Sequence, residues 1–146
     1  MAVIHGMFDT GAMPAAESLV KFTAARQQVL ADNVANLSTP YFKPRDLDPG
    51  SFQSALSDAI DRRRQTASPI RGQLEFRDTR QLRFGGERIE VRPEATHDNV
   101  LFHDQNNRDL ERLMQRVAEN TMAHRLGTEL VRNQFDMLRL AIRERF

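Results

Sequence analysis

The sequence predicts a mainly α fold in which two long terminal helices pack side by side as an antiparallel, coiled-coil-like pair. Apolar residues recur at steps of three and four over residues 14–37 and again over residues 104–146, the spacing that gathers them on one face of a helix. Residues 38–103 hold five of the six prolines and four of the seven glycines, which favours a short helix and a small β-hairpin or irregular unit there. We expect one domain over residues 1–146, with residues 1–13 as a flexible leader.

The first long helix is predicted to begin at Pro14, because proline suits the first turn of a helix. It should end near Leu37, because Thr39 precedes a proline and Pro40 has no N–H to donate. Its apolar face carries Ala16, Val20, Thr23, Gln27, Leu30, Val34 and Leu37. A helix with such a face needs a partner along its length.

The middle region is expected to hold one short helix and one hairpin. Asp48-Pro49-Gly50 is a turn signal, after which Ser51 can cap a helix that closes at Arg62-Arg63-Arg64. Gly85-Gly86 separates two alternating segments and predicts a two-residue hairpin turn. In that register Leu82 faces Ile89. Arg83 then opposes Arg88, and two like charges across a strand pair are destabilising.

The second long helix shows a heptad stripe sustained for more than four repeats. Gly127 should weaken the middle of this helix by about 1 kcal/mol relative to alanine. The stripe consists of Leu110, Met114, Val117, Thr121, His124, Thr128, Val131, Phe135, Leu138 and Ile142, and it is widened by Leu113, Met122, Leu130 and Met137. The two helices together carry more apolar surface than one partner can cover, which favours a subunit that assembles with neighbours.

The residues show no chemistry that points to an enzyme. Cysteine is absent, and the four histidines have no helical metal-pair spacing. The motifs of phosphate loops, dinucleotide folds and nucleophilic serines are absent too. We therefore expect no cofactor, no bound metal and no catalytic residue, and we interpret His124 as a polar core or interface position.

Two other classes of function remain as alternatives. A basic binding module would use an arginine-rich nucleic-acid face of Arg62–Arg64, Arg71, Arg77, Arg80 and Arg83. A net charge of +1 and the interleaved acidic residues argue against nucleic acid as a partner. An enzymatic role comes third. No apolar run approaches the roughly 20 residues of a membrane-spanning helix, and the N-terminus lacks the pattern of an ordinary signal peptide.

In the stretch Ala24 to Asp46, a helix ending in A-R-Q-x-x-L-A-x-N-x-A-N is followed by T-P-Y-F-K-P-R-D. This stretch resembles the N-terminal signature of flagellar axial proteins, the rod, hook and hook-associated subunits. Tyr41 departs from that pattern, which has glycine after Thr-Pro, and a bulky residue resists the positive φ of the usual tight turn, so the sequence leaves open whether that turn forms. Residues 104–111 and Ala118-Glu119-Asn120 resemble the entry to the C-terminal helix of the FlgB family of proximal rod proteins.

This resemblance implies a structural subunit of the proximal rod of the bacterial flagellar basal body. Such a subunit would assemble helically with itself and other rod subunits around the export channel and transmit torque for motility. Its partners would be rod and basal-body proteins and the export apparatus. It would lie in the periplasmic rod and be exported without a cleaved signal peptide.

Residues of both helices and of the segment between Thr39 and Lys43 are expected to form the assembly interface. Asn33 and Asn36 suit either capping of a helix end or, as the resemblance favours, fixing the register of packed helices. The predicted interface consists of Arg26, Gln27, Leu30, Asn33, Asn36, Thr39, Pro40, Tyr41, Phe42, Lys43, Val117, Asn120, His124, Val131, Phe135 and Leu138.

Overall fold

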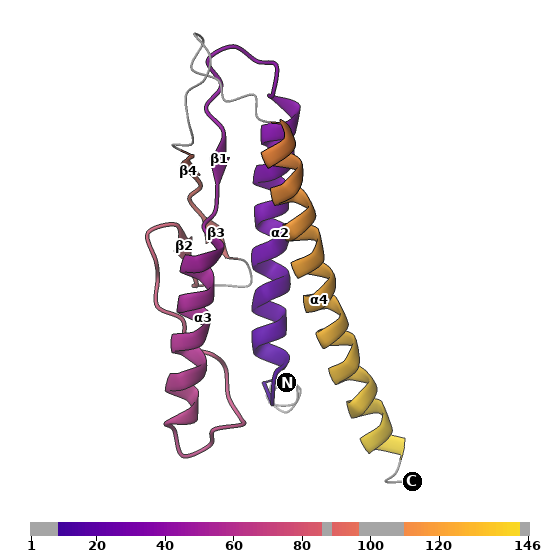
Figure 1. The fold of residues 1–146 in the computed structure, drawn as a ribbon. Coiled ribbons are helices and arrows are strands. Elements are labelled where there is room, and N and C mark those ends of the chain that lie inside the picture. Colours follow the sequence, from indigo (N-terminus) through magenta and orange to yellow (C-terminus); the bar gives the residue numbers. More distant parts are fainter. Residues whose placement is uncertain (1–8, 86–88, 97–109, 144–146) are drawn as a thin grey trace.

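The computed structural model describes residues 9–85, 89–96 and 110–143. Its two long helices, α2 (Met13–Ala35) and α4 (Leu110–Arg143), lie side by side and run in opposite directions (Figure 1). A third helix, α3 (Pro49–Arg64), and four two-residue strands lie on the side of α2 away from α4. The predicted mainly α fold with an antiparallel helix pair is confirmed. The leader's residues 1–8 and the predicted helix start at residues 104–109 lie outside the described residues.

Helix α2 has 23 residues and ends two residues earlier than the position expected from the sequence. Pro14 lies in its first turn, as the sequence predicts. The backbone N–H of Asn36 still donates to Asp32, after which the chain leaves the helix through successive turns up to Tyr41. The helix therefore ends before the Thr39–Pro40 step, because the turns that precede proline already need non-helical backbone.

Helix α3 has 16 residues and begins with a capping interaction by Asp48. The Asp48 carboxylate accepts from the backbone N–H groups of Gly50 and Ser51, both at 3.0 Å. Ser51 was expected to cap this helix, but it lies inside the first turn, and the carboxylate three residues earlier satisfies the free donors. Arg62, Arg63 and Arg64 occupy the last turn, where cations complement the helix dipole.

The strands form two antiparallel pairs with a register that differs from the expected hairpin. Strand β2 (Leu82–Arg83) pairs with β3 (Glu90–Val91), so that Leu82 faces Val91 and Arg83 faces Glu90. The predicted pairing with Ile89 and Arg88 is therefore wrong by two residues. The observed register gives Arg83 an acidic neighbour and keeps Leu82 buried, whereas the tighter turn would have opposed two arginines.

Strand β1 (Arg45–Asp46) pairs with β4 (Glu94–Ala95), a pairing that the sequence did not indicate. Thr96 extends the contact, because its backbone N–H and its hydroxyl both donate to the carbonyl of Pro44. The segment that follows α2 is thereby held along the middle region (Figure 1).

The main hydrophobic core lies between α2, α3 and the strands. It is centred on Phe22, Val29, Leu47, Phe52 and Leu82. The rings of Phe22 and Phe52 stack with their centroids 4.2 Å apart and their planes 5° from parallel. Of the described residues in α4, Leu113 is the one large apolar side chain that is buried. The apolar core is therefore on the side of α2 that α4 does not cover.

Helix α4 has 34 residues, and its contact with α2 follows a different stripe from the one expected. Residues that are buried or half-buried recur at steps of four and three: Leu113, Val117, Asn120, His124, Gly127, Val131, Gln134 and Leu138. Four of these were in the predicted stripe, whereas its members Met114, Phe135 and Ile142 are 40–52% exposed. The observed stripe is rich in polar and small residues. A search for hydrophobic residues alone therefore chose positions next to this stripe instead of the stripe itself.

Gly127 permits the close approach of the two helices. A Cβ atom at this position would lie 2.9 Å from Cγ2 of Val20 and 3.4 Å from the side chain of Leu19. Carbon atoms in ordinary contact lie about 3.5–4.0 Å apart. Glycine in the middle of α4 therefore has a packing role in addition to its low helix propensity.

Candidate assembly surface

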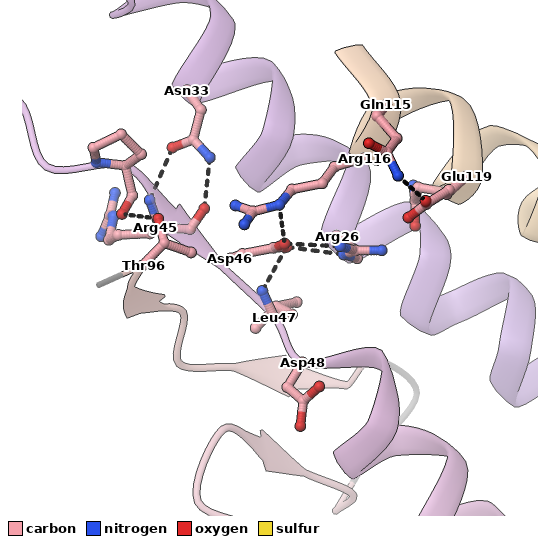
Figure 2. Close-up of polar contacts among 12 residues, drawn as sticks. Arg26, Asn33, Arg45, Asp46, Leu47, Asp48, Thr96, Gln115, Arg116 and Glu119 are labelled. Carbon is pink, nitrogen blue, oxygen red and sulfur yellow. Dashed lines mark hydrogen bonds and ion pairs between the residues drawn. The ribbon is translucent and has the colours of Figure 1, made fainter. Parts of the chain in front are cut away.

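Asp46 ties the segment that follows α2 to both long helices (Figure 2). Its carboxylate accepts from Nε and Nη2 of Arg26 on α2, at 2.8 and 2.7 Å, and from the backbone N–H of Leu47 at 2.8 Å. Nε of Arg116 on α4 lies 3.9 Å away. The Arg26 and Asp46 side chains are only 7% and 12% exposed. This bidentate geometry is the strongest ordinary form of an ion pair, and partial burial protects it from screening.

Asn33 holds the same segment one residue earlier. Its side-chain Nδ2 donates to the carbonyl of Arg45 at 2.5 Å, and its Oδ1 accepts from the N–H of Arg45 at 3.0 Å. The side-chain amide thus pairs with a strand residue much as a neighbouring strand would (Figure 2). Asn33 was expected to fix the register of packed helices; it fixes instead the position of β1 against α2. Asn36 caps the end of α2, since its Nδ2 donates to the carbonyl of Asp32.

The register of the helix pair itself depends on Asn120 and His124. Nδ2 of Asn120 donates to the backbone carbonyl of Thr23 at 3.0 Å and to Oε1 of Gln27 at 2.9 Å. Nδ1 of His124 lies 2.8 Å from the hydroxyl of Thr23. Asn120 is 2% exposed, and its Oδ1 is one of the buried polar atoms without a hydrogen-bond partner among the described residues. Directional contacts of this kind specify one alignment of α4 on α2 at a cost in stability.

Residues Thr39 to Phe42 form a tight turn in which Tyr41 adopts the left-handed conformation. The N–H of Phe42 donates to the carbonyl of Thr39, and Tyr41 has a φ of +62°. Proline at the second position and positive φ at the third are the features of a type II turn. The sequence left this turn open because Tyr41 replaces the glycine of the family pattern. The turn forms with tyrosine, whose side chain is 74% exposed.

A second apolar stripe lies on the side of α4 away from α2, and we call it the outer face. Its members recur at steps of four, four, seven and three, and they are 39–69% exposed: Met122, Leu126, Leu130, Met137 and Leu140. Three of them were noted in the sequence as widening the main stripe, but Leu126 and Leu140 were missed. A helical wheel centred on Leu126 rather than on Val131 identifies the set.

The structure divides the predicted interface residues into three groups. Four are buried within the subunit in contacts of its own: Arg26, Leu30, Asn33 and Asn120. A neighbouring subunit cannot reach these side chains in this conformation. Val117, His124, Val131 and Leu138 are half-buried along α4, as is Phe42 in the turn, and Asn36 is half-buried at the end of α2. The exposed members are Gln27, Thr39, Pro40, Tyr41, Lys43 and Phe135.

The arginines of the alternative nucleic-acid face are partly engaged within the chain. Arg62 donates to the carbonyl of Glu75 at 2.7 Å, and Arg63 donates to that of Gly11 at 2.8 Å. Arg80 pairs with Glu94 at 2.6 Å. The first two contacts connect α3 to the loops around it, and the third sets a negative charge beside one of the arginines that would face phosphate groups.

Neither a metal cluster nor a spanning helix is found in the part of the chain that the structure describes. Within residues 9–85, 89–96 and 110–143, no group of three or more potential ligands is placed to hold a metal ion. Over the same ranges, no helix combines the length and the apolar character needed to cross a membrane. His97 and His103 lie outside the described residues.

The fold and its surfaces define a mainly helical protein with two long paired helices. Polar contacts align these helices, and a row of large apolar side chains on α4 is exposed. No family model matches the sequence. The flagellar basal body rod protein FlgB of Borrelia hermsii is 30% identical over 122 residues, which cover 81% of this chain and 85% of that protein. The chain therefore belongs to the FlgB family of flagellar basal body rod proteins.

Proposed function

We propose that the chain is a structural subunit of the flagellar rod that joins neighbouring subunits through the outer face of α4. The observation that carries the proposal is this face, because five large apolar side chains with 39–69% exposure follow one side of a single helix. Burying one such side chain contributes about 1.5–3 kcal/mol, so the uncovered row is a substantial driving force for association. The relative's name, flagellar basal body rod protein, identifies a structure in which such association would take place.

In that role the subunit would assemble with copies of itself and with other rod proteins around the export channel and carry torque. A stiff subunit suits this task, and two features support stiffness. Asp46 links β1 to α2 and approaches Arg116 of α4, and Asn120 aligns α4 on α2. The same proposal includes contacts of the subunit with the export apparatus. It also includes passage across the membrane without cleavage of a signal peptide.

Leu126→Asp tests the proposal directly. Leu126 is 55% exposed, so the variant should fold with a nearly unchanged melting temperature. In an assembly, however, the new carboxylate would be desolvated without a partner, which costs several kcal/mol. We expect the variant to be missing from purified basal bodies and the cells that carry it to be non-motile.

Thr128→Asp is the matched control, because it adds the same charge to α4 at an exposed position off the outer face. It should leave recovery and swimming unchanged. Normal incorporation of Leu126→Asp would refute the role of the outer face. Absence of the unmodified chain from basal bodies would refute the proposed function itself.

A further inference from the structure

We propose that the turn from Thr39 to Lys43 of one subunit docks through Tyr41 onto the outer face of α4 in a neighbouring copy of the same chain. This inference rests on the proposed function and names the two surfaces that meet. It begins from Tyr41, whose exposed ring gains little packing within the subunit to offset its positive φ.

Tyr41 is the one non-glycine residue with positive φ among the described residues, at +62°. A side chain in this region crowds the following carbonyl, so glycine would suit the turn better. A strained residue persists where it has a use that outweighs the strain. The ring of Tyr41 is 74% exposed and therefore adds little to the packing of its own subunit. Its use is expected to lie in a contact with another molecule.

The surroundings of Tyr41 suit a docking contact. Ser38, Thr39 and Pro40 are exposed beside it, so the ring belongs to a run of four exposed residues at the turn. Asn36 and Pro40 make the turn rigid, because the amide of Asn36 caps α2 and proline restricts its own φ. A rigid aromatic side chain loses little conformational entropy on binding, and such residues are frequent anchors of protein interfaces.

The outer face of α4 suits this anchor in its chemistry. Met122 and Met137 offer thioether groups, which pack favourably against aromatic rings. Leu126 and Leu130 supply aliphatic surface between them. The charges beside the face are mixed: the exposed acids Glu129 and Asp136 offer partners for Lys43, but the exposed Arg125, Arg132 and Arg139 lie next to them, and Asp136 is 3.6 Å from Arg139.

The positions of the two surfaces favour an open assembly over a closed pair. The turn lies where the chain leaves α2, whereas the outer face consists of residues of the other long helix, α4 (Figure 1). The two patches are different, so each subunit presents one of each to its neighbours. Contacts between unlike patches of identical subunits extend into rings or helical arrays, the geometry that a rod requires.

Photo-crosslinking tests which surfaces meet. The chain with Tyr41→benzoylphenylalanine would be expressed in place of the unmodified chain, and basal bodies would be purified and irradiated. We expect a product of twice the 16.8 kDa mass of the chain, with the link mapped by mass spectrometry to residues 119–140 of a second copy. A link to another protein or to another segment would overturn the inference, and so would the lack of any link in basal bodies that contain the chain. Absence of the unmodified chain from basal bodies would instead refute the proposed function.

Tyr41→Gly separates docking from folding, because it relieves the strain and removes the ring. We expect its isolated subunit to melt at a higher temperature than the original, while its recovery in basal bodies falls at least about tenfold, as for loss of an interface anchor. Tyr41→Phe, the matched control, keeps the ring and should assemble normally. Normal recovery of Tyr41→Gly would overturn the inference.

Discussion

Replacing Gly127 by alanine sets helix propensity against packing in one substitution. In the interior of a helix, alanine is about 1 kcal/mol more favourable than glycine. The added Cβ, however, would lie 2.9 Å from Cγ2 of Val20 and 3.4 Å from two atoms of Leu19. Overpacking of this kind costs about 1–3 kcal/mol. Val20 cannot turn its methyl group away, because β-branched residues in helices keep one rotamer about 90% of the time.

We therefore expect Gly127→Ala to lower the free energy of unfolding by about 1 kcal/mol in total, the difference between these two effects. Urea denaturation of the isolated subunit measures it. Val20→Ala removes the obstructing methyl group, so Gly127→Ala in that background should stabilise the protein. The coupling energy of the double-mutant cycle should then exceed about 1 kcal/mol.

Ala118→Gly provides the control, because Ala118 is an exposed residue of the same helix and reports the propensity difference alone. If Gly127→Ala stabilised the subunit by the full propensity difference in both backgrounds, the helices would not approach closely at this position. The reasoning about the contact between α2 and α4 would then be wrong.

Two further predictions follow from the ion pair and from the position of the core. Asp46→Asn should lower the free energy of unfolding by about 3 kcal/mol, because it leaves the buried charge of Arg26 without its partner. The control Asp78→Asn, at an exposed ion pair, should lower it by under about 1 kcal/mol. Equal losses of the two variants in urea denaturation would contradict the assignment. In hydrogen exchange of the monomer, amides of α4 should exchange faster than those around Phe22 on α2, because α4 contributes little to the apolar core. Equal protection of the two helices would show that α4 unfolds together with the core of α2.

The two long helices could be predicted from the sequence because their periodicity depends on local spacing, but the side of α4 that faces α2 could not. Helix α4 has two apolar stripes, and hydrophobicity favours neither as the contact with α2. The contact depends on Gly127, which admits Val20, and on Asn120, which bonds to Thr23. Shape and directional bonds of this kind become visible only when both helices are placed.

The turn at Tyr41 and the hairpin both show where reasoning from neighbouring residues alone is not enough. For Tyr41, the steric preference of one residue argued against a turn that Pro40 and the hydrogen bond from Phe42 to Thr39 nevertheless form. For the hairpin, the Gly85-Gly86 signal predicted the shortest loop, but pairing of Arg83 with Glu90 moved the register by two residues. In both cases a contact a few residues away outweighed the preference of the residues at the turn.

Polar and apolar contacts on α4 are divided between its two sides. Apolar burial has no direction, so an apolar contact between α2 and α4 would tolerate slippage by a turn of helix. The bonds of Asn120 and the close approach at Gly127 allow one alignment only. That alignment turns Leu126 and Leu130 outward. The directional contacts inside the subunit thus fix its alignment, and under the proposed function the exposed apolar side chains remain available for neighbouring subunits.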